Sequence, residues 1–263
     1  MNILIPILTL GVLGLLFGVG LALAAKKFCV ETDPRLDKVY AKLPGANCGA
    51  CGMPGCMGFA EGLIQGSCSV EHCVVCSEEA REAIAKILGA GAKANVKKIA
   101  VLYCYGGNKR VKDKFVYSGI KNCAAANIIM GGQKACFYGC IGLGDCVKVC
   151  PFGAITMSEE DLPIVDEAKC KACNKCVLTC PKKLFSLVPV TGKVFVACSS
   201  HDPGKDTKAA CSVGCIACGL CVKACKFDAI KVVDNLAVID YHKCTSCGEC
   251  VKACPMKTIR VRA

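Results

Sequence analysis

Cysteine occurs in regularly spaced runs in the second half of this sequence. One run has gaps of two, two and three residues with a proline after its last member, and it consists of Cys170, Cys173, Cys176 and Cys180. The same run, from Cys244 to Pro255, begins 74 residues later. Three cysteines at such gaps can wrap around one corner of an iron–sulfur cubane, and the fourth binds a neighbouring cluster. Each run therefore needs a partner run, and the pattern predicts a carrier of electrons.

The partner runs give crossed ligand sets for three predicted clusters. Cluster 3 is expected to use Cys150, Cys170, Cys173 and Cys176. Cluster 4 is expected to use Cys215, Cys218, Cys221 and Cys254. Cluster 5 is expected to use Cys225, Cys244, Cys247 and Cys250. In each set the distant cysteine is the last member of the partner run.

Two further sites have less regular spacing. Cluster 2 is expected to use Cys136, Cys140, Cys146 and Cys180. Its glycines at 139, 142 and 144 let the backbone wind around a cubane where the gaps are wider. Cluster 1 is expected in an amino-terminal module that contains Cys48, Cys51 and Cys56. Cys68, Cys73 and Cys76 compete as its fourth ligand, and spacing alone does not decide between them.

The composition favours metal thiolates over disulfides. The chain has 27 cysteines in 263 residues, a density that usually marks a secreted disulfide scaffold. Here neighbouring cysteines lie too close in sequence for independent disulfides. Zinc is the alternative metal, but zinc sites come as separated pairs of cysteines instead of runs closed by proline. Iron–sulfur clusters in a reducing compartment are therefore favoured.

The formal charge of +12 invites a nucleic-acid partner. However, each oxidised cubane with four thiolates carries about −2. Five such sites would reduce the net charge to about +2. We therefore expect the basic residues to compensate the clusters, and we expect no nucleic-acid partner.

The first 25 residues resemble a membrane anchor. Residues 3–25 are uncharged and apolar apart from Thr9. As a helix they would extend about 35 Å, enough to cross a hydrocarbon core of about 30 Å. Lys26 and Lys27 follow, which places the rest of the chain on the cytoplasmic side of the cell membrane. A cleaved signal peptide is the alternative, but no basic residue precedes the apolar stretch.

We expect an α+β fold with a transmembrane helix, a small single-cluster domain and two tandem bacterial-ferredoxin-like modules. A helical turn is predicted from Pro34, and a helix from its N-cap Ser77 to Gly89. Strands are predicted at 98–104 and 193–198, and a hairpin at 230–239. An apolar residue five positions after each fourth cysteine is expected to cover a cubane. The predicted boundaries are 1–25 (anchor), 26–43 (linker), 44–90 (single-cluster domain and helix), 91–135 (basic connector with strand), 136–192 (module 1) and 193–263 (module 2).

The whole arrangement resembles the B subunit of the Rnf complex, the ion-translocating ferredoxin:NAD oxidoreductase of bacterial membranes. The resemblance rests on the apolar anchor, the C-G-x-C-G-x-P-x-C motif at 48–56 and the ferredoxin-like runs. It implies that Cys73 completes cluster 1, because the family's motif leaves sixteen residues before its fourth cysteine. The chain departs from shorter members by having two ferredoxin-like modules, by Lys226 after Cys225, and by the wider run at Cys136.

The resemblance also implies the function. Reduced ferredoxin would deliver electrons to five [4Fe-4S] clusters, and other membrane subunits would receive them. The chain would be part of an ion-translocating oxidoreductase without a substrate-converting site of its own. A polyferredoxin subunit of another membrane oxidoreductase, such as a hydrogenase or a respiratory dehydrogenase, is the main alternative. A membrane-anchored zinc or interaction module without a redox role is the alternative from a different class.

Two features are left without a fixed role. Seven cysteines remain outside the predicted sites, namely Cys29, Cys68, Cys76, Cys104, Cys123, Cys198 and Cys211. We interpret them as buried thiols or spare sulfurs, with the alternative that Cys104, Cys123, Cys198 and Cys211 form a sixth site. Residues 93–134 contain eight lysines and Arg110 but only Asp113 as an acid, which suits either an acidic ferredoxin or a solvated surface.

Overall fold

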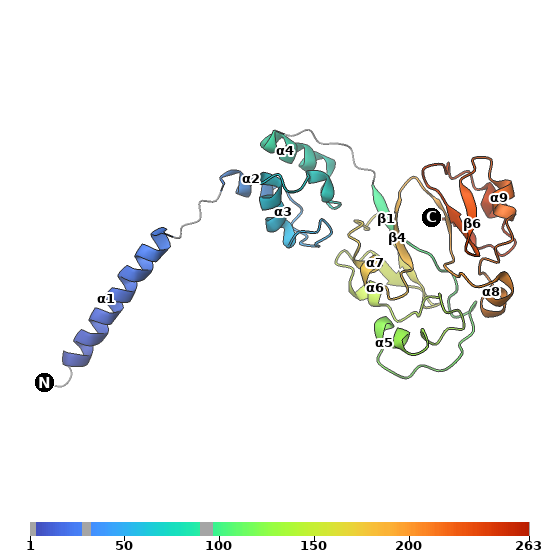
Figure 1. The fold of residues 1–263 in the computed structure, drawn as a ribbon, viewed down its shortest axis with the longest axis horizontal. Helices are drawn as coiled ribbons and strands as arrows, with labels where there is room; N and C mark the ends of the chain where they lie inside the picture. The colour runs from blue at the N-terminus through green and yellow to red at the C-terminus, as the bar shows by residue number, and fades with distance from the viewer. Residues whose placement is uncertain (1–3, 28–32, 90–96, 263) are drawn as a thin grey trace.

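A computed structural model describes residues 4–27, 33–89 and 97–262 of the chain (Figure 1). The helices are α1 (Leu4–Lys27), α2 (Arg35–Tyr40), α3 (Gly55–Ile64), the 3-10 helix η1 (Val70–His72), α4 (Glu78–Leu88), α5 (Cys123–Ile128), α6 (Asp145–Lys148), α7 (Lys175–Thr179), α8 (Gly204–Ala210), α9 (Leu220–Ala224) and α10 (Glu249–Ala253). The strands are β1 (Lys98–Leu102), β2 (Ile155–Met157), β3 (Pro163–Val165), β4 (Phe185–Pro189), β5 (Val194–Val196), β6 (Ile230–Val233), β7 (Leu236–Ile239) and β8 (Ile259–Val261).

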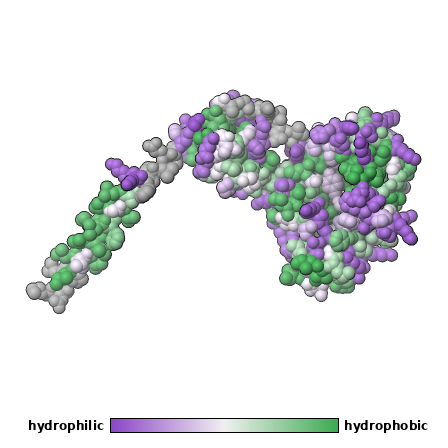
Figure 2. All heavy atoms as spheres, in the orientation of Figure 1, coloured by the Kyte–Doolittle hydropathy of each residue, from purple (hydrophilic) through white to green (hydrophobic). Residues whose placement is uncertain are grey.

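Helix α1 is long and apolar enough to cross a membrane. The candidate span is Ile7–Lys27, with a mean hydropathy of 2.4 and no part of it buried against the rest of the chain. Figure 2 shows hydrophobic residues over the visible face of α1 and hydrophilic ones at its carboxyl end, where Lys26 and Lys27 lie. An isolated apolar helix of this length needs a non-aqueous environment to bury its side chains.

The amino-terminal module packs α2, α3 and α4 around Val39, Phe59 and Ile84. Its last helix begins and ends as the sequence predicts. The Ser77 hydroxyl accepts a hydrogen bond from the amide of Ala80, which satisfies one unpaired amide of the first turn. Gly89 adopts a left-handed conformation with φ of 70° and ends the helix. The predicted turn after Pro34 is confirmed as α2.

The carboxyl-terminal body repeats one topology. In the first copy β1 pairs antiparallel with β4, and β2 pairs with β3. In the second copy β5 pairs antiparallel with β8, and β6 pairs with β7. The strand that precedes each module therefore pairs with the last strand of that module. Helix α6 packs on α7 in the first copy, as α9 packs on α10 in the second.

The predicted hairpin is confirmed at β6 and β7. Asp234 and Asn235 join the two strands with φ of 47° and 60°. Two successive residues with positive φ form the tight turn whose twist matches that of the strands. The Asn235 side chain donates to the carbonyl of His201 at 3.1 Å and fixes the turn to the preceding segment. Each copy has its own core, centred on Ile99 and Phe185 in the first and on Val194 and Ile230 in the second.

Candidate iron–sulfur sites

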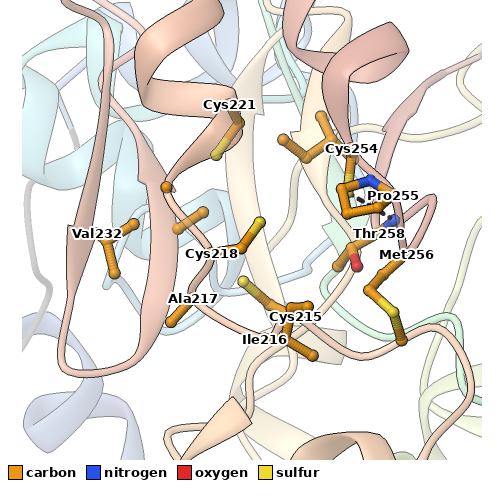
Figure 3. Close-up of a pocket in the computed structure, with 13 residues that line it drawn as sticks. Cys215, Ile216, Ala217, Cys218, Cys221, Val232, Cys254, Pro255, Met256 and Thr258 are labelled. Carbon is orange, nitrogen blue, oxygen red and sulfur yellow. Dashed lines mark hydrogen bonds between the residues drawn. The ribbon is translucent and has the colours of Figure 1, made fainter.

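One pocket in the second copy is lined by the four thiols expected for cluster 4. The pocket lies between the loop before α9, the start of α9, the hairpin of β6 and β7 and the segment after α10, and Cys215, Cys218, Cys221 and Cys254 line it. Figure 3 shows their sulfur atoms turned toward the same space. Ile216, Ala217, Val232 and Met256 supply the surrounding apolar surface. Four convergent thiols in an apolar pocket form a suitable donor set for a cubane.

Two further pockets are lined by the thiol sets expected for clusters 3 and 5. Cys150, Cys170, Cys173 and Cys176 line the first. Cys225, Cys244, Cys247 and Cys250 line the second. The empty volumes of the three pockets are similar, at 350, 330 and 310 Å³. In all three pockets the last cysteine of one run thus lies with the first three cysteines of its partner run.

Local backbone geometry positions these thiols. Within the runs, Ala172, Ala217 and Ser246 have φ between 52° and 57°. This left-handed residue turns the chain back so that the flanking cysteines face one point. After the last cysteine of each run, the amide four residues on donates to its sulfur at 3.3–3.5 Å, in the pairs Ala154–Cys150, Leu184–Cys180, Ala229–Cys225 and Thr258–Cys254.

The apolar covers predicted from the sequence are confirmed. Ile155, Phe185, Ile230 and Ile259 are all buried. Each lines the pocket that contains the cysteine five residues before it. A side chain in this position excludes water from one side of the site, and solvent exposure is one of the factors that set a cluster's reduction potential.

The pocket at the cluster 2 position is lined by a different set of thiols from the one expected. Cys123, Cys140, Cys146 and Cys180 line it, together with the cover Phe185, and its empty volume is 390 Å³. Cys136 is not among its lining residues and packs instead with Val111 and Cys211. Cys123 lies at the start of α5, a segment that cysteine spacing does not connect with this site.

The backbone around Cys140 explains why Cys123 lines this pocket in place of Cys136. Gly142 has φ of 87° and Gly144 has φ of 75°, as Ala217 has 54° and Gly219 has 72° in the second copy. The segment therefore follows the regular cysteine loop, with Leu143 at the place of the middle cysteine. The thiol that Leu143 lacks comes from Cys123. A comparison of the two copies position by position would have shown this gap from the sequence.

Asp145 holds Cys123 at the pocket. Its Oδ2 atom accepts a hydrogen bond from the amide of Cys123 at 2.8 Å, and Asn122 caps α5 through the amide of Ala125. Asp145 is itself buried. A buried carboxylate beside the site adds negative charge, and it contributes to the raised pKa of the Cys123 thiol, whose main cause is burial.

The amino-terminal module gathers five cysteines around one core. Cys56, Cys73 and Cys76 are buried there, and Cys51 and Cys68 are packed against them. The Asn47 side chain accepts from the amide of Cys56 at 2.8 Å, which orders the loop that carries Cys48. A hydrogen bond from Cys76 lowers the pKa of Cys73 to about 6 and raises that of Cys76.

Arg81 supplies a buried positive charge at this site. Its guanidinium donates to the Cys73 carbonyl at 2.9 Å, and its Nε atom has no hydrogen-bond partner within the described residues. A buried cation without a counter-ion is costly. Its charge lowers the pKa of both Cys73 and Cys76 as a minor cause. The arrangement favours negative charge on the sulfur side, as a cluster with four thiolates would provide.

Burial opposes ionisation of the thiols that line the pockets. It raises the pKa of Cys146 and Cys176 to about 12 and of Cys221 and Cys250 to about 11, and neighbouring thiols raise them further. Bound iron supplies the compensating positive charge, because coordination deprotonates a thiol outright. Across residues 4–27, 33–89 and 97–262, no three His, Cys, Asp or Glu side chains are arranged to hold a single ion. A cubane needs a wider set, because each thiolate binds a different iron atom.

The basic segment, residues 97–134 of the described chain, is only partly available to a partner. Lys134 is 4% exposed and pairs with Asp113 at 3.0 Å. Arg110 pairs with Glu160 and lies over the ring of Tyr105. The exposed lysines among its described residues are Lys97, Lys98, Lys109, Lys112, Lys114 and Lys121. Exposed apolar side chains, including Val116, Ile120 and Ile128, occur in the same stretch, and Figure 2 shows hydrophobic surface where α5 lies.

Family comparisons agree with this division of the chain. The FeS family, described as an Fe-S cluster domain, matches residues 43–75. The 4Fe-4S dicluster domain family matches twice, at residues 139–184 and 214–259. The first match lies within the amino-terminal module, and the other two lie one in each copy of the repeated topology.

Three relatives are similar over most of their length, and each is the B subunit of its complex. The one from the Na(+)-translocating ferredoxin:NAD(+) oxidoreductase complex of Acetobacterium woodii is 49% identical over 242 residues, 92% of this chain and 73% of that protein. The one from the ion-translocating oxidoreductase complex of Methanosarcina acetivorans is 42% identical, over 95% of both chains. The one from the proton-translocating ferredoxin:NAD(+) oxidoreductase complex of Clostridium ljungdahlii is 43% identical, over 93% of this chain and 87% of that protein.

Proposed function

Because the chain belongs to the family of B subunits of ion-translocating ferredoxin:NAD(+) oxidoreductase complexes, we propose that it accepts electrons from reduced ferredoxin and passes them to membrane partner subunits. Each [4Fe-4S] cluster supplies one-electron redox chemistry when bound. The observation that supports this most strongly is the set of four pockets, each lined by four thiols and an apolar cover.

The proposal assigns ligands to five clusters. Clusters 3, 4 and 5 keep the sets expected from the sequence. Cluster 2 takes Cys123 in place of Cys136, because Cys123 lines its pocket. Cluster 1 takes Cys48, Cys51, Cys56 and Cys73, with Arg81 as the adjacent cation. Cys68 and Cys76 stay as neighbouring thiols, and Cys29 lies outside the described residues.

In this proposal the site of cluster 3 lies next to that of cluster 1 in the amino-terminal module and next to that of cluster 2 in its own module. The Cys48 thiolate adds to the raised pKa of Cys173, which connects clusters 1 and 3, although burial is the main cause. Cys146 of cluster 2 also raises the pKa of Cys176 of cluster 3, although burial and the other thiols of cluster 3 are the larger causes. This connects clusters 2 and 3. Charges affect each other at short range in a protein interior. Neighbouring clusters are what a chain of electron transfers requires.

Helix α1 anchors the protein in this proposal. Lys26 and Lys27 at its carboxyl end support a cytoplasmic location of the cluster domains, because positively charged residues flank membrane helices mainly on the cytoplasmic side. A reporter fused to the carboxyl terminus of the full chain tests this orientation. Activity of a reporter that works only in the cytoplasm is expected, and activity only of an exported reporter would overturn the orientation.

Rapid mixing of reduced ferredoxin with the full chain tests the function. The chain is purified anaerobically in detergent, and loss of its visible absorbance is followed over time with ferredoxin at a small, catalytic concentration that an enzyme keeps reduced, so that the colour of oxidised ferredoxin does not mask the change. We expect ferredoxin to bleach the protein at a rate that falls with added salt, because exposed lysines attract an acidic donor. Bleaching by dithionite but not by ferredoxin would overturn the assignment of the donor. A colourless zinc protein with little sulfide would overturn the redox role.

A pair of charge reversals locates the docking surface. Lys112→Glu and Lys121→Glu change exposed residues of the basic segment. Lys86→Glu changes an exposed lysine on α4 and serves as the matched control. We expect the first two variants to slow bleaching by ferredoxin several-fold at low salt and to converge with the control at high salt. Equal rates for all three would exclude this surface.

A further inference from the structure

Four cysteines of the carboxyl-terminal body are left after these assignments, and they form two equivalent pairs. The two dicluster matches start at residues 139 and 214, which are 75 residues apart. The same offset relates Cys136 to Cys211. Cys104 follows β1 by two residues, and Cys198 follows β5 by two residues. Each copy therefore contributes one cysteine from a strand end and one from the loop before its first cluster run.

Hydrogen bonds between the copies bring these four residues together. The Ser199 hydroxyl donates to the carbonyl of Tyr103 at 2.9 Å, which joins the residues next to Cys198 and Cys104. The segment 110–113 lies between the other two cysteines. Val111 forms a β-bridge with Cys211, and the carbonyl of Lys112 accepts from the amide of Ala135 at 2.8 Å, next to Cys136.

Glycine lets the backbone pass close to these thiols and to Val111, because a Cβ atom on Gly106 would lie only 2.6 Å from Cγ2 of Val111. A Cβ atom on Gly106 would lie 3.3 Å from the sulfur of Cys211 and 3.7 Å from that of Cys104. Gly139 is also close to Cys136, since its Cβ atom would lie 3.7 Å from that sulfur. The Cys136, Cys198 and Cys211 side chains are buried, and Val111 packs against Cys136 and Cys211.

Backbone amides donate to these sulfurs as they do at the regular sites. The amides of Gly106 and Cys140 lie 3.5 and 3.4 Å from the sulfur of Cys104. The amides of Ser200 and Cys215 lie 3.4 and 3.3 Å from the sulfur of Cys198. Amide hydrogen bonds to sulfur stabilise cluster thiolates and tune their potential. The two equivalent cysteines thus receive equivalent pairs of donors.

Charge supports the same grouping. The pKa of Cys136 is raised to about 12. Burial is the main cause, and Cys104, Cys198 and Cys211 raise the pKa further. Cys104, Cys198 and Cys211 therefore lie close enough to Cys136 for their charges to act on it. Arg110 is near Cys211 and lowers its pKa as a minor cause, although burial raises it.

We propose that Cys104, Cys136, Cys198 and Cys211 bind a sixth [4Fe-4S] cluster at the interface of the two ferredoxin-like modules. This proposal rests on the proposed function, and the sixth cluster would complete the path of electrons through the carboxyl-terminal body. The Cys140 amide joins it to cluster 2, and the Cys215 amide joins it to cluster 4. An electron that leaves one of these clusters would reduce the sixth cluster and then pass to the other, which returns the sixth to its oxidised state.

Iron and acid-labile sulfide per chain test the proposal. The full chain is produced with an intact cluster-assembly system and purified anaerobically in detergent. Six cubanes give about 24 iron atoms and 24 sulfides, whereas five give about 20 of each. About 20 of each would overturn the sixth site and leave the five-cluster function standing. Little iron and sulfide would overturn both.

A double variant decides which cysteines hold the extra cluster. Cys104→Ala and Cys211→Ala should each remove about four iron atoms, and the two together should also remove about four. A loss of about eight in the double variant would mean two separate sites and would overturn the proposal, as would no loss in either single variant. Cys68→Ala, a thiol of the amino-terminal module, is the matched control and should lose none.

Two readouts separate a lost cluster from a lost fold. Electron paramagnetic resonance of the reduced protein should lose the signal of one cluster in Cys211→Ala and keep the signals of the others. Rapid mixing with ferredoxin should then bleach at the normal rate the clusters on the side of the missing sixth cluster where ferredoxin docks. The clusters on the other side of the missing cluster should bleach at least tenfold more slowly. Unchanged bleaching of all remaining clusters would overturn the bridging position. Should a variant lose every cluster, the count on the unmodified chain still decides between five and six.

Discussion

Ile259 offers a measure of how much the apolar cover of one site contributes to stability. Its side chain is 3% exposed and lines the pocket of cluster 4, whereas Val261 on the same strand is 55% exposed. Replacing a buried isoleucine by alanine costs about 2–5 kcal/mol. An exposed replacement costs about 0.5 kcal/mol or less. We therefore expect Ile259→Ala to lower the free energy of unfolding by about 3 kcal/mol, and Val261→Ala to change it little.

The assay is a urea series on the anaerobic full chain, followed by loss of visible absorbance. With a urea dependence of about 2 kcal/mol per molar, a loss of about 3 kcal/mol moves the midpoint down by about 1.5 M. Unfolding that releases iron is irreversible, so both variants are compared with the unmodified chain after one fixed incubation time. Val261→Ala is the matched control because it shortens an apolar residue of the same strand β8. Equal midpoints for the two variants would refute the view that Ile259 seals the site.

Three further changes test individual contacts. Arg81→Gln should lower the reduction potential of cluster 1, because a reduced cluster has one more negative charge and the variant lacks the positive charge that stabilises it. The decrease is about 60 mV if the buried charge is worth about 1.4 kcal/mol. A redox titration in which the potential rises would contradict this. Asp145→Asn should raise the potential of cluster 2 while iron content stays constant, since the amide oxygen still accepts from Cys123, and loss of about four iron atoms would show that the charge itself is needed. Asn235→Ala should lower the free energy of unfolding by about 1 kcal/mol, because alanine tolerates a φ of 60° poorly, and an unchanged urea midpoint would refute this role of the turn.

Much of the fold could be predicted because its signals are local. Ser77 and Gly89 cap α4 through atoms within one turn of the helix. Asp234 and Asn235 form their hairpin turn with the positive φ values that these residue types tolerate. The apolar covers follow from a fixed offset of five residues after a cysteine. In all these cases the interacting groups lie within a few residues, so sequence position determines spatial position.

The thiol sets of clusters 3, 4 and 5 were foreseeable for the same reason. Three members of each set lie within seven consecutive residues, and a left-handed residue such as Ala217 turns them toward one point. The fourth crosses from the partner run, which the repeated pattern indicates. The four thiols expected for each set line one pocket apiece.

Cys123 and Cys136 mark the limit of such reasoning. Cys136 is four residues from Cys140, so sequence distance favours it for the same site. In the structure the Cys123 amide is held by Asp145, and Cys136 faces the second copy beside Val111. The 75-residue offset shows that Leu143 stands where the second copy has Cys218, but it does not show that the connection before α6 brings Cys123 to that place.

The sequence by itself determined that this chain binds several iron–sulfur clusters, that its cysteine runs are duplicated, and that an apolar helix precedes them. Those properties follow from residue type and short-range spacing. Only the tertiary structure decided which thiols line the pocket at the cluster 2 position and that Cys104, Cys136, Cys198 and Cys211 lie between the two copies. Their meeting depends on the packing of one copy against the other, through contacts such as Ser199 with Tyr103 and Val111 with Cys211. Such contacts join residues about one hundred positions apart, and no periodic pattern in the sequence records them.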